Sequence, residues 1–154
     1  MPDIIISDTS CFIILTNIGH LDLLQLVYGS IITTPEVVEE YSLKLPEWVN
    51  IVSPSDRKVQ NMLAQYVDKG EASAIALATE IEGCTIILDD YSARKMAEKL
   101  NLAITGTLGV IIKAKNDGII TSIKPFIERL KATNFRLSPA LYNEALKEAG
   151  EIEK

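Results

Sequence analysis

Two stretches decide the fold: I-I-I-S-D at residues 4–8, and I-I-L-D-D at residues 86–90. Each begins as an apolar run without alternation, the pattern of a strand covered on both faces, and each ends in acid. Segments with helical periodicity lie between the strands, so we expect an α/β domain with a mainly parallel sheet and right-handed crossovers. Because ligands bind beyond the carboxyl ends of such strands, Asp8, Asp89 and Asp90 are the first candidates for a site.

The same patterns predict the other elements. We expect strands at residues 1–8, 31–32, 85–88 and 103–105, with an edge strand at 135–137, and a long loop over residues 46–54. Expected helices are residues 11–17, 21–27, 35 to about 45, 55–68, 71–81, 91–100, 108–116 and 123–132, and a last helix from Ser138. Lys69 and Gly70 are expected to separate the helices at 55–68 and 71–81.

Composition predicts a globular chain. Of 154 residues, 47% are hydrophobic and 23% charged, enough apolar surface to offset the entropy of ordering one domain over residues 1–154. No apolar run approaches the ~20 residues of a membrane span, and no basic stretch followed by an apolar one begins the chain. We therefore expect a cytoplasmic protein with no membrane contact.

The charges are unevenly distributed. Residues 1–90 hold 4 Lys/Arg against 14 Asp/Glu, whereas residues 91–136 hold 9 against 3. This basic segment could form a surface that faces a polyanion beside an acidic cleft; alternatively, its side chains only solvate helix faces. Its members are Arg94, Lys95, Lys99, Lys113, Lys115, Lys124, Arg129, Lys131 and Arg136.

Few residue types remain available for chemistry. Cys11 and Cys84 lie far apart in apolar surroundings and are interpreted as buried thiols. His20 is the single histidine, which nearly excludes imidazole-based zinc sites and histidine-dependent triads. Carboxylates are left as the candidate groups.

Four positions could bring carboxylates together. Asp8 and the Asp89/Asp90 pair end two buried strands and would lie at the same edge of a parallel sheet, although aspartate there also serves as a helix N-cap. Glu71 shares a helical stripe with Ala74, Ile75 and Ala78, so it should face the sheet, where an unpaired carboxylate is costly. The alternative is a solvated Glu71 in a first helical turn, favoured by the helix dipole.

Glu40 is the fourth candidate. It lies at the edge of the apolar stripe of Val37, Val38 and Tyr41 and can reach inward, while Glu36 and Glu39 point away. Taken alone, Glu40 is better interpreted as a surface residue.

Convergence of these acids would predict a metal site. Clustered carboxylates repel one another unless a cation compensates them, and oxygen-only ligands favour Mg²⁺ or Mn²⁺. Such ions activate water and stabilise the charge that develops on a phosphodiester under attack. Lys and Arg nearby would then contact the phosphate backbone.

The sequence resembles PIN-domain proteins of the VapC-like ribonuclease superfamily, most closely its branch of stand-alone members. The matching motifs cover nearly the whole chain: I-I-S-D-T-S at 5–10, I-T-T-P-E-V-V-E-E-Y at 32–41, G-E-A-S-A-I-A-L-A at 70–78, and L-D-D-Y-S-A-R with T-G-T-L-G between 88 and 109. The resemblance implies a three-layer α/β/α domain and a Mg²⁺- or Mn²⁺-dependent endoribonuclease. It also implies a homodimer that acts on RNA as the toxin of a type II toxin–antitoxin module, with a protein antitoxin as partner.

The resemblance also assigns residues. It implies catalytic roles for Asp8, Glu40, Glu71 and Asp90. Asp8, Glu71 and one of Asp89 and Asp90 would hold the metal, and Glu39 could take the place of Glu40. Thr9, Ser10 and Thr107 match hydroxyl positions that line such sites, and Arg94 would contact phosphate.

Two other classes of function compete with this interpretation. A catalytically inactive PIN-like module would bind RNA or a protein without cutting. A phosphoryl-transfer enzyme of receiver or haloacid-dehalogenase type would also place aspartates at strand ends. However, Asp8 is not followed by the D-x-D-x-T pattern, and residues 103–105 lead to Gly106 rather than to lysine.

Overall fold

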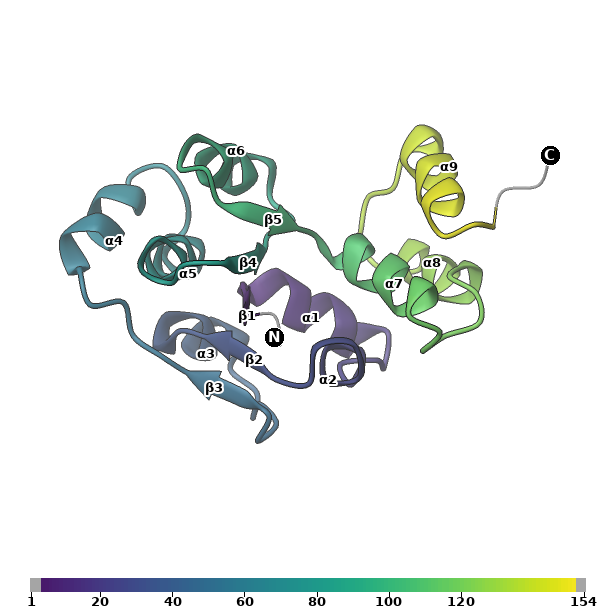
Figure 1. The fold of residues 1–154 in the computed structure, drawn as a ribbon, viewed down its shortest axis with the longest axis horizontal. Helices are drawn as coiled ribbons and strands as arrows, with labels where there is room; N and C mark the ends of the chain where they lie inside the picture. Colours follow the sequence, from purple (N-terminus) through teal and green to yellow (C-terminus); the bar gives the residue numbers. More distant parts are fainter. Residues whose placement is uncertain (1–3, 152–154) are drawn as a thin grey trace.

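A computed structural model describes residues 4–151 of the chain, in which five parallel strands form one sheet in the order β3-β2-β1-β4-β5 (Figure 1). The strands are β1 (Ile4–Ser7), β2 (Ile31–Thr33), β3 (Val49–Ile51), β4 (Cys84–Ile87) and β5 (Ala103–Thr105). The helices are α1 (Thr9–Asn17), α2 (Leu23–Tyr28), α3 (Pro35–Tyr41), α4 (Arg57–Leu63), α5 (Lys69–Glu80), α6 (Tyr91–Lys99), α7 (Thr107–Asn116), α8 (Lys124–Lys131) and α9 (Pro139–Glu148). The prediction of a parallel sheet is confirmed.

The order of the strands places the acidic segments together. The chain runs outward from β1 through β2 to β3, and then returns to β4 and β5 on the other side of β1. β1 and β4 therefore flank the point where the direction of the connections reverses, which is where ligands bind in open α/β sheets. Ser7 pairs with Ile87, so Asp8 and Asp89 follow neighbouring strand ends almost in register.

Helices cover both faces of the sheet. On one face, Ile5 and Ile87 pack in a core with α1, α2 and α7; on the other, Ile6 and Ile86 pack with α5 and α6. Figure 1 shows these two helical groups on opposite sides of the strands. The three-layer α/β/α architecture is therefore confirmed, and the unalternating strands match burial on both faces.

Helix α5 lies unusually deep, since every residue from 70 to 78 is buried. Its alanines, at positions 72, 74, 76 and 78, allow close approach to the sheet. The predicted break at Lys69 and Gly70 is wrong, because Asp68 caps the helix and these two residues form its first turn.

Other boundaries also differ from expectation. Val49–Ile51 forms the edge strand β3 inside the expected loop, through pairs such as Ile31 with Val49, whereas residues 135–137 form no strand. Helix α3 stops at Tyr41 because Ser42 adopts a left-handed conformation, φ 61°. Helix α4 is shorter than the expected span of 55–68.

Several smaller expectations can also be compared with the structure. Residues 1–3 of the first expected strand lie outside the described residues. Cys11 and Cys84 are buried free thiols, as predicted. In the described range 4–151, no helix combines the length and the apolar character needed to cross a bilayer.

Candidate metal centre

Asp8 occupies the end of the central strand with only half of its carboxylate satisfied. Its backbone is extended, and Oδ1 accepts a hydrogen bond from the Cys11 amide at 3.1 Å, which caps α1. The side chain is fully buried, and Oδ2 accepts no hydrogen bond of normal geometry in the described part of the chain, although the Asp89 backbone amide lies close enough to the carboxyl to oppose the rise in its pKa. A buried acceptor without a partner is costly, so Oδ2 indicates a partner of another kind.

The electrostatic environment of Asp8 brings in two more acids. Burial raises the pKa of Asp8 well above its usual value, and the neighbouring charges of Asp89 and Glu71 raise it further. The charges of Asp89 and Glu71 thus act on Asp8 although both residues are distant from it in the sequence. This is expected if two strand ends and the start of α5 lie at the same edge of the sheet.

Asp89 and Asp90 each bind the start of a different helix. Asp89 accepts hydrogen bonds from the Thr107 amide at 2.9 Å and from the Thr107 hydroxyl, and so fixes the start of α7. Asp90 caps α6 through the Ala93 amide at 3.0 Å. Asp89 is the acid that acts most strongly on Asp8, whereas Asp90 acts on Glu71. Both aspartates thus belong to the cluster.

Glu71 is buried at the third position of α5. It completes a capping box, in which its amide donates to Asp68 at 2.8 Å and its Oε1 accepts from the Asp68 amide at 3.2 Å. Burial, followed by the charge of Asp68 and then that of Asp90, raises the pKa of Glu71 to about 7. The two sequence interpretations of Glu71 are both correct in part, since it faces inward and also lies in the first turn.

Glu40 is exposed, as Glu39 is, but its carboxylate contacts the starts of α1 and α5. Its Oε1 accepts from the Gly70 amide at 2.7 Å, and its Oε2 accepts from the Thr9 hydroxyl at 3.0 Å. The expectation that Glu36 points away is wrong, because Glu36 is buried against Gln60 and lies 3.2 Å from an Arg57 nitrogen.

An open cleft of about 1250 Å³ borders Asp89 and Asp90, whereas Asp8, Glu40 and Glu71 are not among the residues that line it. Asp89, Asp90 and Arg94 line it together with Ser10, and residues 132–136 and α9 form the other side. The Arg94 guanidinium donates to the Leu88 carbonyl at 2.7 Å, which fixes it beside the two aspartates. Thr107, in contrast, is buried and its hydroxyl is held by Asp89.

The basic segment does not form the lining as a block. Arg94 and Arg136 line the cleft. Other members make contacts elsewhere: Lys113 pairs with Asp117 at 3.2 Å, and Arg129 donates to the Ile18 carbonyl.

The donor set suits a hard divalent cation. It contains carboxylate oxygens, one of them buried without a partner among the described residues, and the charges of neighbouring acids raise the pKa values of Asp8 and Glu71. Over residues 4–151, no three side chains of the acid, histidine or cysteine type already stand close enough to hold an ion together. The fit therefore lies in the chemistry of the donors and in their convergence on one sheet edge.

Fold and cluster together define a class: a parallel α/β domain with acids at the switch point of the sheet, which is a nuclease-like arrangement. A family model described as a PIN domain matches residues 4–151, so the chain belongs to the PIN-domain family. PIN domains are generally nucleases and typically use divalent metals. A search of curated proteins found no significant match to the chain.

Two features of the site lay outside the sequence predictions. The first is Gly70, whose amide donates a hydrogen bond to Glu40. The second is Glu36, whose ion pair with Arg57 connects α3 to α4. The glycine at position 70 was the signal in the sequence for its contact with Glu40. Glycine is a poor helix former, so its presence in the first turn of a helix suggests that the backbone is approached closely there. The periodicity of α3 gave no indication that Glu36 contacts α4.

Proposed function

We propose that this PIN domain is a Mg²⁺- or Mn²⁺-dependent endoribonuclease whose metal is held by Asp8, Glu71, Asp89 and Asp90. One observation carries the proposal: Oδ2 of Asp8 is buried without a hydrogen-bond partner among the described residues, and the charges of Asp89 and Glu71 act on the same carboxyl. Of these three acids, Asp89 also lines the open cleft. A cation would satisfy that oxygen and offset the repulsion within the cluster. When bound, the ion supplies a polarised water and stabilises charge on the phosphodiester.

The residues of the chain have separate roles in this proposal. The capping bonds hold one oxygen of Asp8 and one of Asp90 and leave the other oxygen free. Thr107 fixes the orientation of Asp89. Arg94, held by the Leu88 carbonyl, would contact a phosphate in the cleft, and the Ser10 hydroxyl would donate to the substrate.

The experiment is hydrolysis of a panel of small structured RNAs with Mn²⁺, with Mg²⁺, and with chelator. We expect cleavage by the wild type with either ion, none with chelator, and none by Asp8→Asn, whose near-isosteric side chain still caps α1. Equal cleavage by Asp8→Asn and the wild type would contradict the assignment of the site.

A binding module without catalysis is the second candidate. The capping bonds favour this candidate. The carboxylates of Asp89, Asp90 and Glu71 all accept hydrogen bonds from backbone amides at helix starts, which leaves fewer oxygens for a metal ion. RNA retention by the wild type without cleavage in any divalent ion would support this candidate over the nuclease.

We extend the proposal to a toxin that acts as a homodimer under the control of a protein antitoxin, supported by the resemblance of the four sequence motifs. Induced expression of the wild type in a bacterial host should arrest growth, and Asp8→Asn should not. Growth at the same rate with both would contradict the toxin role without touching the ribonuclease assignment.

A further inference from the structure

We propose that Tyr66 and Tyr91 are substrate-binding residues, whose rings each stack on one base of a single-stranded RNA segment beside the acidic cluster. This inference rests on the proposed function, because RNA is the substrate that the function names. It gives a role to two residues that are neither acids nor part of the cleft lining.

The two tyrosines differ from the other aromatic residues in their packing. The chain has three phenylalanines, five tyrosines and one tryptophan, all within the described residues 4–151. Seven of these nine side chains belong to the core that contains Phe12, whereas Tyr66 and Tyr91 belong to neither core. Their exposed fractions are 66% and 72%. Packing within the fold therefore does not account for these two rings.

Both rings belong to segments that border Glu71. Tyr91 directly follows Asp90, the cap of α6, and is the first residue of that helix. Tyr66 lies two positions before Asp68, the cap of α5, and the Glu71 carboxylate accepts a hydrogen bond from the Asp68 amide at 3.2 Å. The charges of Asp68 and Asp90 both act on Glu71, and α5 packs against α4 and α6 (Figure 1). The exposed rings are therefore carried on two segments next to the proposed metal centre.

Positive charge lies close to each ring in the structure or in the sequence. The Lys95 ammonium lies over the Tyr91 ring, 5.4 Å from its centroid, and Lys69 is exposed three positions after Tyr66. These lysines offset part of the repulsion that the nearby aspartates exert on a phosphate chain. Exposed aromatic rings accompanied by cations suit unpaired bases, which stack on such rings, whereas a paired helix keeps its bases inside. The combination therefore favours single-stranded RNA as the occupant.

RNA binding tests the inference in protein that does not cleave. The probe is a fluorescently labelled single strand of about ten nucleotides, titrated with Asp8→Asn protein in chelator and measured by anisotropy. Added to this background, Tyr66→Ala and Tyr91→Ala should each weaken binding about tenfold, the loss expected for one stacked base. Tyr66→Phe and Tyr91→Phe keep the ring, so the affinity should stay within about twofold of the parent.

An abasic RNA strand of the same length separates stacking from every other contact. It keeps the phosphates and sugars but has no bases, so the parent protein should bind it more weakly than the ordinary strand. Tyr66→Ala and Tyr91→Ala should cause no further loss with this strand, because the interaction that they remove is already absent.

Leu26→Ala is the matched control. Leu26 is 55% exposed on α2, a helix that leads into the amino end of β2, at the sheet edge opposite the acids. Its replacement should leave the affinity for both strands unchanged. Denaturant unfolding of each variant shows that the fold is kept.

Several results would overturn the inference. They are parental affinity for the ordinary strand in both alanine variants, equal losses on the ordinary and abasic strands, and no RNA binding by the parent. Unchanged RNA affinity with an altered oligomeric state in light scattering would assign the rings to contact with a second copy of the chain instead.

Failure of this inference is distinguishable from failure of the proposed function. If the wild type cleaves RNA with Mn²⁺ and Tyr91→Ala leaves both KM and kcat unchanged, the nuclease remains and the stacking role is wrong. If the wild type cleaves nothing but the alanine variants lose affinity as expected, catalysis fails and the stacking role remains. With both correct, Tyr91→Ala should raise KM about tenfold and leave kcat within about twofold, since stacking of a base is binding that substrate and transition state share.

Discussion

Asp8 is a costly residue for stability at its position. The raised pKa means that the fold disfavours its charged form, so this group favours folding below the ordinary value of 3.8 and destabilises the fold as pH rises toward the raised native pKa. A neutral side chain of the same shape would avoid this cost. This cost supports the proposal that Asp8 binds a cation.

The first prediction concerns Asp8→Asn without divalent ions. At pH 7.5 with chelator, we expect the variant to be more stable than the wild type by about 1 kcal/mol, because a disfavoured charge is removed while the cap of α1 is kept. Denaturant unfolding measures the difference in unfolding free energy.

Added Mn²⁺ should raise the melting temperature of the wild type and leave that of Asp8→Asn unchanged. An equal rise for both proteins would show that Asp8 does not bind the ion.

Single residues explain how far the site could be predicted from sequence. Asp8 and Asp90 each matched two interpretations, a helix cap or a metal ligand: the structure shows both capping bonds, with Asp8 buried and Asp90 exposed, and the ligand roles stay predictions. Glu71 matched an inward-facing acid or a solvated first-turn residue, and it is a buried residue of the first turn. Periodicity placed Glu40 correctly at the edge of its stripe. It could not show the partners of Glu40 or Glu36, since these come from helices brought together only by the tertiary fold.

Among the elements, long apolar runs were predictable and edge segments were not. β1 and β4 are buried on both faces, so their β-branched runs are clear signals. β3 has one buried residue, Val49, and forms through pairing with β2, which leaves little trace in its own sequence. The start of α5 was missed because the Asp68 cap outweighs the low propensity of Gly70.

The contact between α3 and α5 gives an element-level prediction. Gly70→Ala should destabilise the protein by less than about 1 kcal/mol, because alanine is the better helix former and the added methyl group meets only the carboxylate end of the exposed Glu40 side chain, which can move aside at the loss of its bond to the amide of residue 70. Chemical unfolding measures it. The double variant Gly70→Ala with Glu40→Ala should be more stable than the sum of the single effects predicts; strict additivity would contradict the contact.

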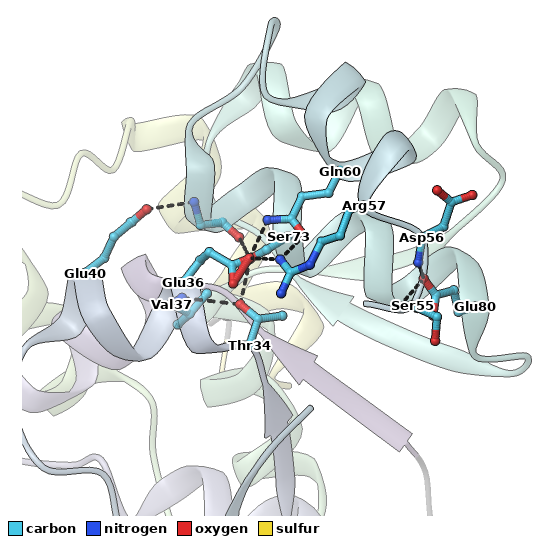
Figure 2. A network of polar contacts seen from close by, with 11 residues as sticks. Thr34, Glu36, Val37, Glu40, Ser55, Asp56, Arg57, Gln60, Ser73 and Glu80 are labelled. Carbon is cyan, nitrogen blue, oxygen red and sulfur yellow. Dashed lines mark hydrogen bonds and ion pairs between the residues drawn. The ribbon is translucent and has the colours of Figure 1, made fainter. Parts of the chain in front are cut away.

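The end of α5 supports the start of α4 in a pH-dependent way. Glu80 accepts from the Ser55 amide at 2.8 Å and from the Asp56 amide at 3.1 Å (Figure 2), and these bonds lower its pKa. A lowered pKa contributes stability above the ordinary value of 4.5 that is lost as pH falls through the native value.

Because Glu80 is exposed and solvent screens its charge, we expect Glu80→Gln to cost only about 0.2–0.3 kcal/mol at pH 7, and to have no effect in acid below that native pKa. Unfolding free energies measured across this pH range provide the comparison. A cost that stays constant with pH would show that the charge of Glu80 does not contribute.

For the whole molecule, the distribution of basic residues sets how strongly salt controls RNA binding. The chain carries a net charge of −6, and Arg94 and Arg136 are the members of the basic segment that line the cleft. With two phosphate contacts, log K for single-stranded RNA should fall with log salt at a slope of about −1.4.

Asp8→Asn protein allows this measurement without cleavage. Adding Arg94→Ala or Arg136→Ala should reduce the slope by about 0.7, whereas Lys113→Ala, at a residue paired with Asp117, should leave it unchanged. A slope steeper than about −4 would show that the basic segment acts as one continuous surface instead.

A crystal soaked in Mn²⁺ tests the central claim most directly, because anomalous scattering locates the ion without reference to activity. We predict a peak in contact with Asp8 Oδ2, with Glu71 and at least one of Asp89 and Asp90 drawn onto the same ion. Mn²⁺ bound only at other positions, with Asp8 Oδ2 still unpartnered, would contradict the account.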